Sequence, residues 1–245
     1  MNRVYKRFGD FYLRAGSYLK ERFVDTMIEM PVGKIRYEYG FGFESLYHPY
    51  YEALKLDDID KAKRLLYDFV LSFRSQIECY PPDQALTVQA WKFYDRKITN
   101  YLSQGSPETH FLPRPDESLE DYLESKVGQI YKLKESISSK GYDSALFNSS
   151  PIRGVMVDDR FLVLGGQHRC LVLNFLGYKN IPVQHKTKYI NIPAVMDSSD
   201  VRGLPLVKRA LISNASASVV LKRISTGIKK EQASSLGFPF SESYL

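Results

Sequence analysis

Apolar residues recur at helical spacing in two long stretches of the chain. The first covers residues 58–78, and either Asp57 or Asp58 can serve as its N-cap. The second runs over 119–141 and ends on a glycine, which is typical of a helix C-terminus. The spacing predicts a helix over each stretch, and a further helix is expected over roughly 84–102.

Two shorter apolar runs follow, and their pattern indicates strands. Residues 151–157 and 161–164 flank the polar segment Asp158-Asp159-Arg160, which predicts a β-hairpin. The aromatic, glycine-interrupted stretch 35–43 suits a loop or an irregular edge strand. Its rings could stack on a sugar or a base, but packing in the core or against a partner is the default expectation.

The second run of the hairpin leads into the most informative segment, residues 161–183. An apolar strand meets two glycines, then a helix that should end at Gly177, and then the strand 181–183. Backbone N–H groups and the positive end of the helix dipole meet at such a turn, and glycine allows close approach to the backbone. The pattern therefore predicts a site for a phosphate-bearing ligand. Its residues would be Gly165, Gly166, Gln167, His168 and Arg169.

A segment rich in Pro, Gly and Ser, residues 103–118, suggests a boundary within the chain. We expect an aromatic-rich, mainly helical N-terminal region over 1–105 and a small α/β domain over 106–195. The remaining residues, 196–245, should form a basic helical extension with a frayed Ser/Gly-rich tail. The predicted fold class is α+β.

Composition narrows the class of partner. The net charge of +6 and the pI near 9.1 favour anionic ligands such as nucleotides, nucleic acid or phosphorylated sugars. The two cysteines lie far apart, and the four histidines are scattered without metal-ligand spacing. We expect no zinc site, no membrane span and a cytoplasmic location.

From about 108 to 190 the order is an acidic segment, helix, Pro-Ile strand, hairpin, Gly-Gly-x-His-Arg, helix and Ile-Pro-Val strand. This order resembles the ParB/sulfiredoxin-like superfamily, over about a third of the chain. The resemblance implies a small mixed-sheet domain whose glycine-x-x-Arg turn binds nucleotide phosphates. It assigns ATP or another nucleoside triphosphate, with Mg²⁺, to Gly165–Arg169.

The branches of that superfamily differ in chemistry. Sulfiredoxins carry a nucleophilic cysteine immediately before His-Arg, where this chain has Gln167, and Cys170 lies about one helical turn further on. Cys170 is expected to be a buried small hydrophobe. Partition proteins continue with a helix-turn-helix, for which the residues after Val183 give no clear signal.

A third branch consists of small-molecule kinases, in which a glutamate deprotonates the acceptor hydroxyl. The resemblance places that acid just before the first long helix, where this chain has Asp116, Glu117 and Glu120. Glu117 is our first candidate for the general base. Acidic residues at a helix start are more often caps or partners of the helix dipole, so both roles stay open.

Three further features each allow more than one interpretation. Asp158 and Asp159 could bind magnesium with the nucleotide, but an Asp-Asp hairpin tip is by default a turn. His168 could contact phosphate or hold the turn by a hydrogen bond. The basic stretch 201–230 could contact DNA phosphates.

The sequence thus favours an ATP-dependent phosphotransferase acting on a small hydroxyl-bearing metabolite or sugar. The alternative is a non-enzymatic, nucleotide-gated DNA-binding or regulatory protein. A degenerate scaffold without ligand is a third possibility.

Overall fold

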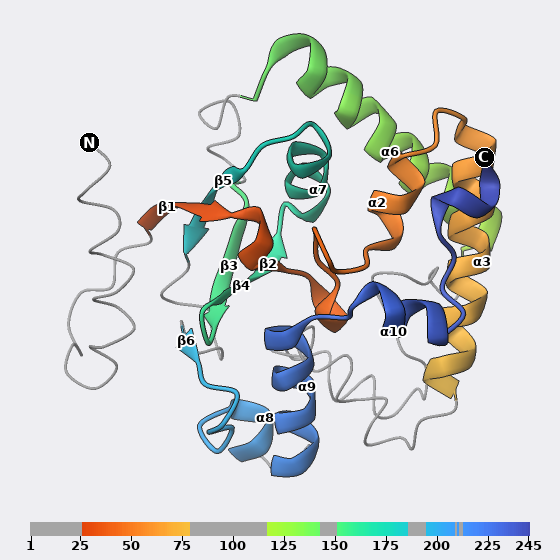
Figure 1. Ribbon diagram of the computed structural model, residues 1–245. Coiled ribbons are helices and arrows are strands. Elements are labelled where there is room, and N and C mark those ends of the chain that lie inside the picture. The colour runs from red at the N-terminus through yellow and green to blue at the C-terminus, as the bar shows by residue number, and fades with distance from the viewer. Residues whose placement is uncertain (1–25, 79–116, 143–150, 186–194, 209, 211–212) are drawn as a thin grey trace.

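Helices cover both faces of a central mixed sheet (Figure 1). The computed structural model describes residues 26–78, 117–142, 151–185, 195–208, 210 and 213–245. The strands are β1 (Thr26–Pro31), β2 (Ile35–Arg36), β3 (Arg153–Val157), β4 (Arg160–Gly165), β5 (Asn180–His185) and β6 (Val195–Met196). The α-helices are α2 (Pro49–Leu54), α3 (Ile59–Glu78), α6 (Leu119–Lys140), α7 (Gln167–Phe175), α8 (Pro205–Lys208), α9 (Asn214–Thr226) and α10 (Lys230–Ser235). Short 3-10 helices are η1 (Val32–Lys34), η2 (Glu38–Gly40) and η3 (Ser241–Tyr244).

The strand order is β1-β5-β3-β4-β2, and β6 pairs with the far end of β3. Strands β3 and β4 form the predicted antiparallel hairpin, with Asp158 in the left-handed region at φ 52° in its two-residue turn. β1 runs antiparallel to β5, whereas β2 runs parallel to β4. The predicted α+β class is confirmed.

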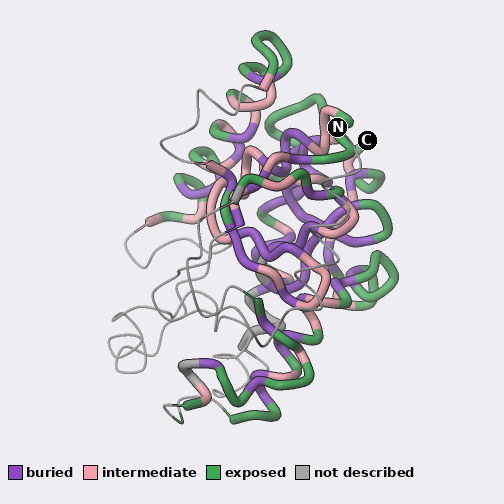
Figure 2. Tube along the Cα trace, turned by 90° about the vertical axis from the view of Figure 1, so that its left-hand side faces the viewer, coloured by how far each residue is buried: buried purple, intermediate pink, exposed green. Residues whose placement is uncertain are grey.

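Alternate residues of the hairpin strands point to different layers. Phe161 and Val163 of β4 belong to the larger core, which also contains the buried side chains of α2, α3, α6 and α7. Leu162 of β4 and Val155 of β3 point to the opposite face and pack with Leu221 of α9. Figure 2 shows this buried interior surrounded by exposed helix faces.

The two helices predicted from apolar spacing are confirmed. Helix α3 begins after Asp58, whose Oδ1 accepts hydrogen bonds from the amides of Asp60 and Lys61. Helix α6 begins after Ser118 and ends at Gly141. The helix expected over 84–102 lies outside the described residues.

The aromatic stretch is an edge strand followed by an irregular turn, as its pattern suggests. Residues of β2 form the edge of the sheet, and η2 follows directly. Tyr37, Phe41 and Phe43 are buried, and the ring of Tyr37 meets that of His48 edge-on at 4.5 Å. These rings pack in the core.

The three segments distinguished by composition share one core. Strands β1 and β2 come from the first segment but pair with β5 and β4 of the second. The larger core also contains Ile228, Ala233 and Phe238 from the third segment. The composition shift near residue 105 therefore does not separate two cores within the described residues.

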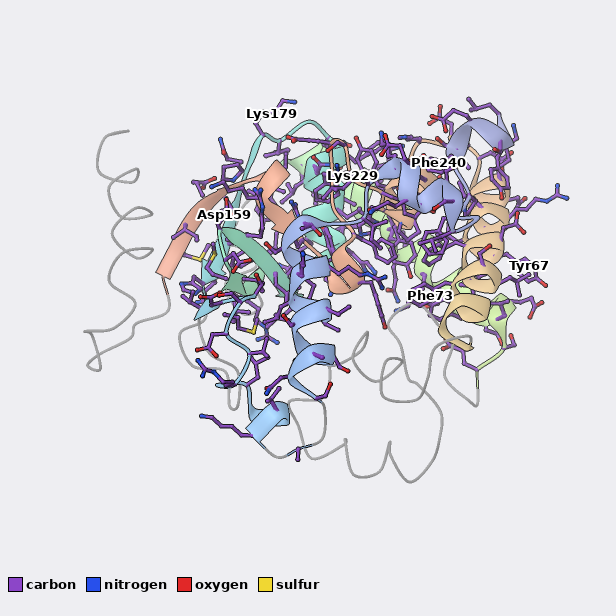
Figure 3. The ribbon with its side chains drawn as sticks, turned by 60° about the horizontal axis from the view of Figure 1, so that its bottom comes forward. Tyr67, Phe73, Asp159, Lys179, Lys229 and Phe240 are labelled. Atoms are coloured by element: carbon purple, nitrogen blue, oxygen red, sulfur yellow. The ribbon has the colours of Figure 1, made fainter. Side chains whose placement is uncertain are left out.

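The prediction of a frayed C-terminal tail is wrong. Phe238 stacks on Tyr47 with ring centroids 5.5 Å apart, and Ser241 donates its hydroxyl to the buried Glu52 carboxylate at 2.9 Å. Figure 3 shows Phe240 in the same C-terminal segment and Phe73 on the inner side of α3. Two phenylalanines within a polar sequence are sufficient anchors, because each removes a large apolar area from water.

Candidate functional site

The glycine turn has the geometry that its sequence predicts. β4 ends at Gly165, and Gly166 is the N-cap of α7 in the left-handed region, at φ 79°. The main-chain carbonyl of Gly166 accepts the amide of Cys170, which closes the first helical turn. Gly177 follows α7 at φ 89°, and β5 begins three residues later. The first-turn N–H groups of α7 therefore point toward the turn, as in anion-binding helices.

Both glycines are closely approached by other residues, and Gly166 is also held at positive φ. A Cβ at Gly165 would lie 2.8 Å from Nε of Arg153, and one at Gly166 would lie 3.0 Å from Nη2 of Arg169. A Cβ at Gly166 would also lie 3.0 Å from the Cα of Ile152, and this backbone atom cannot rotate away as a side chain could. The missing side chains let two guanidinium groups lie against the turn.

Positive charges gather around this turn. Burial lowers the pKa of Arg169, and the charge of Arg153 lowers it further, while Tyr142 raises it. The positive charge of Lys126 is near enough to His168 to lower the pKa of that imidazole. The N-terminal end of α7 thus adds its dipole to a cationic surrounding.

His168 is held as a neutral imidazole. Its pKa is lowered to about 4, first by burial and then by the charge of Lys126. Its ring meets that of Tyr50 edge-on at 5.7 Å. A neutral ring can donate or accept a hydrogen bond at the turn without adding a charge.

Gln167, at the position of the sulfiredoxin cysteine, has contacts that hold the turn. Its side-chain amide donates to the carbonyl of Val163 at 3.4 Å, and its own carbonyl accepts the hydroxyl of Tyr37 at 3.4 Å. Because the side-chain amide of Gln167 donates to the backbone of β4, its backbone N–H is the donor that could bind an anion.

Glu117 acts electrostatically on Tyr122, which bonds the tyrosine that contacts His168. The pKa of Tyr122 is raised by burial, by Tyr50 and by the negative charge of Glu117, in that order. The Tyr122 and Tyr50 hydroxyl oxygens are 3.0 Å apart, and the Tyr50 ring contacts His168. Among these contacts, the link from Glu117 to the glycine turn is its electrostatic effect on Tyr122.

The alternative role of Glu117, as a helix cap, is filled by Ser118. The Ser118 hydroxyl oxygen accepts the amide of Asp121 at 3.0 Å. Glu120 is exposed in the first turn of α6, and Asp116 lies outside the described residues. Glu117 remains the candidate base of this segment, and its position just before α6 is also that of a partner of the helix dipole.

Asp158 and Asp159 lie at the other end of β4, at the hairpin tip, and Figure 3 labels Asp159 there. A six-residue strand spans roughly 17 Å, so these carboxylates cannot share a magnesium ion with a ligand at the glycine turn. Asp159 forms ion pairs with Lys34 at 3.4 Å and Arg160 at 3.2 Å. Asp158 accepts the amide of Ser198 at 3.0 Å. Both make the contacts of a turn.

Other chemistry receives little support. Among the described residues, no group of three or more His, Cys, Asp or Glu side chains could hold a metal ion. Cys170 is buried, and burial raises the pKa of its thiol to about 12, as expected for a structural residue. None of the described helices has the length and apolarity needed to cross a membrane.

Helix α9, within the basic stretch 201–230, lies on the other side of the sheet. Its apolar positions pack against β3, on the face opposite α7 (Figure 1). Lys208 and Lys222 of this stretch are exposed, whereas Arg202 pairs with Asp200 at 2.9 Å. Arg209 lies outside the described residues.

Sequence reasoning missed four side chains near the turn: Tyr50, Tyr122, Lys126 and Arg153. Arg153 follows the Pro-Ile pair that marks β3, and the hairpin register places it opposite Gly165. Lys126 lies one turn after Tyr122 on α6, and its Nζ lies 5.6 Å from the Tyr122 ring centroid. Only the hairpin position of Arg153 carries a signal that the sequence could have given.

Comparison with protein-family models, with curated proteins and with solved structures finds no match to this chain. The order of motifs around the glycine turn therefore remains the basis of the family resemblance.

Proposed function

We propose that this chain has a ParB/sulfiredoxin-like domain that binds a nucleoside triphosphate, ATP first of all, at Gly165–Arg169. We further propose an ATP-dependent phosphotransferase that acts on a small hydroxyl-bearing metabolite or sugar. One observation carries the proposal. The charge of Glu117 acts on Tyr122, whose hydroxyl bonds that of Tyr50, and the Tyr50 ring contacts His168 at the cationic glycine turn.

The turn supports the phosphate half of this proposal. First-turn amides of α7 and the guanidinium of Arg169 supply donors for phosphate oxygens. Gly165 and Gly166 let the side chains of Arg153 and Arg169 lie close against the backbone of the turn, where they could meet a bound phosphate. Mg²⁺ would arrive with the nucleotide and be held mainly by its phosphates, with charge neutralisation as its contribution.

Glu117 supports the transfer half. Its carboxylate would take the proton from the acceptor hydroxyl while that oxygen bonds to the terminal phosphorus and the bridging P–O bond breaks. The nucleoside diphosphate leaves with the bridging oxygen. Arg169 and the α7 amides would stabilise the charge that develops on the phosphate oxygens.

The alternative, a nucleotide-gated DNA-binding or regulatory protein, is favoured by one connection. The amide of Ile228, just after basic α9, donates to the carbonyl of Gly40 at 2.9 Å. The same aromatic loop holds the turn through Tyr37. Salt-dependent DNA retention that disappears when Lys208 and Lys222 are neutralised would favour this function over phosphotransfer.

The test pairs binding with turnover. Thermal shifts with ATP, ADP, CTP and GTP, with and without Mg²⁺, identify the nucleotide, because a ligand at 100 times its Kd adds about 2.7 kcal/mol of stability. Arg169→Ala should abolish the shift. Glu117→Gln should retain the shift and lose phosphotransfer to a panel of hydroxyl acceptors, whereas the control Glu120→Gln keeps both. Turnover by Glu117→Gln would remove Glu117 from the mechanism.

A further inference from the structure

We infer that Arg153 is a second phosphate-binding residue, which together with Arg169 selects ligands that carry two or more linked phosphates over monophosphates. The inference rests on the proposed nucleotide site and names its ligand class. Arg153 comes from β3, a different strand from the one that leads into the turn.

The position of Arg153 is fixed by the hairpin register. It pairs with Gly165, and the register shifts between Arg153 and Gly154. A Cβ at Gly165 would lie 2.8 Å from Nε, 3.0 Å from Cγ and 3.4 Å from Cδ of Arg153. The arginine side chain therefore lies along the glycine at the mouth of the turn, although it has exposed surface.

The charges around Arg153 favour an anion. Its positive charge is near enough to Arg169 to oppose the charge of that guanidinium. None of the ion pairs formed by the described residues involves Arg153. Two like charges at one turn repel each other, and a bound polyanion would offset that repulsion.

The arrangement indicates more than one phosphate. The α7 amides and Arg169 together can satisfy a single phosphate group at the helix end. Arg153 approaches from the strand side of Gly165, whereas Arg169 lies against Gly166. Donors against each of the two adjacent glycines suit adjacent phosphates of a diphosphate or triphosphate.

The experiment compares affinities for ATP, ADP, AMP and inorganic triphosphate by calorimetry on the full chain. The proteins are the wild type, Arg153→Gln, Arg169→Gln and the control Arg202→Gln, which removes the same charge from an exposed ion pair away from the turn. We expect the wild type to bind ATP and triphosphate at least about tenfold more tightly than AMP, a typical effect of a charged hydrogen-bonding partner. Arg153→Gln should reduce that ratio about tenfold with little change for AMP, and Arg153→Lys should restore it only in part.

Each outcome decides a different claim. If the wild type binds none of the four compounds, the proposed function and this inference both fail. If Arg169→Gln loses binding while Arg153→Gln keeps the full ATP-to-AMP ratio, only the role of Arg153 is refuted. Equal losses for ATP and AMP in Arg153→Gln would place it on the first phosphate and refute the selection. An equal fall of the ATP-to-AMP ratio in Arg202→Gln would mean that net charge causes the effect, and it would refute a specific role of Arg153.

Discussion

The hydroxyl of Tyr37 donates to the main-chain carbonyl of Gln167 at 3.4 Å, across 130 positions of sequence. Tyr37 is buried beside Phe43 and His48. The first residue of the candidate phosphate helix is thereby tied to the aromatic loop of the N-terminal segment. The position of α7 depends on residues that the family resemblance does not cover.

Tyr37→Phe should test that link. Loss of a buried hydrogen bond typically costs about 1 kcal/mol of stability. We expect that loss in urea unfolding, together with weaker nucleotide binding because the start of α7 is held less firmly. Tyr178→Phe, in an exposed position, is the control. Unchanged stability and affinity in Tyr37→Phe would show that the hydroxyl is not needed at the turn.

Gly166→Ala should destabilise the protein more than Gly177→Ala. Both glycines have positive φ, so each substitution costs about 1 kcal/mol or more in conformational strain. Only Gly166 adds a contact of 3.0 Å with the Cα of Ile152, whereas the space around Gly177 is open. The difference between the free energies of unfolding of the two variants measures the cost of the close contact with Ile152. Equal values would contradict that contact.

Phe238→Ala should be strongly destabilising, by about 3–5 kcal/mol, because the ring is buried among other aromatic rings. Phe240→Ala should cost less, since Phe240 is only partly buried. Chemical denaturation of both variants checks the order. A loss below 1 kcal/mol in Phe238→Ala would mean that the C-terminal segment is not part of the core.

Stability should fall as the pH is lowered from about 6.5 toward 3. Burial lowers the pKa of His48 to about 3, with a further contribution from the nearby charge of His168. Burial also lowers the pKa of His168 to about 4, with a further contribution from the charge of Lys126. The unfolded chain then binds more protons than the folded one throughout this window, so acid favours unfolding, by up to about 1.4 kcal/mol per pH unit for each histidine.

His48→Phe should flatten this dependence. Neither ring nitrogen of His48 has a hydrogen-bond partner within the described residues, and aromatic rings surround it. A phenylalanine of similar shape removes one titrating group and the cost of burying two unpaired polar atoms. We expect a shallower fall in stability between pH 6 and 4 and a higher melting temperature at pH 7. An unchanged pH profile would argue against a neutral buried His48.

Local patterns predicted much of the site. The strand, the glycine pair, α7 and Gly177 occur in the order that their spacing indicates, and the hairpin follows from two apolar runs around Asp158 and Asp159. Such elements depend on interactions between residues close in sequence. The prediction that Cys170 is a buried small hydrophobic residue is likewise confirmed.

Distant pairings could not be predicted. β1 gains its strand geometry from β5, about 150 positions later, and its own short apolar pattern does not specify that partner. Phe238 and Ser241 looked like parts of a polar tail because their partners, Tyr47 and Glu52, lie near the other end of the chain. The approach of Arg153 to Gly165 depends on one register shift in β3.

The stacking of Phe238 on Tyr47 also affects how the protein folds during synthesis. The core that supports α7 includes residues from the thirties to the two hundred and thirties. A chain still emerging from the ribosome lacks the last of these, so the core can close fully only after Phe238 has been synthesised. Contacts of such sequence separation slow folding, and the aromatic loop must wait for them with its rings exposed. Formation of the core around α7 is therefore tied to the synthesis of the segment that carries Phe238.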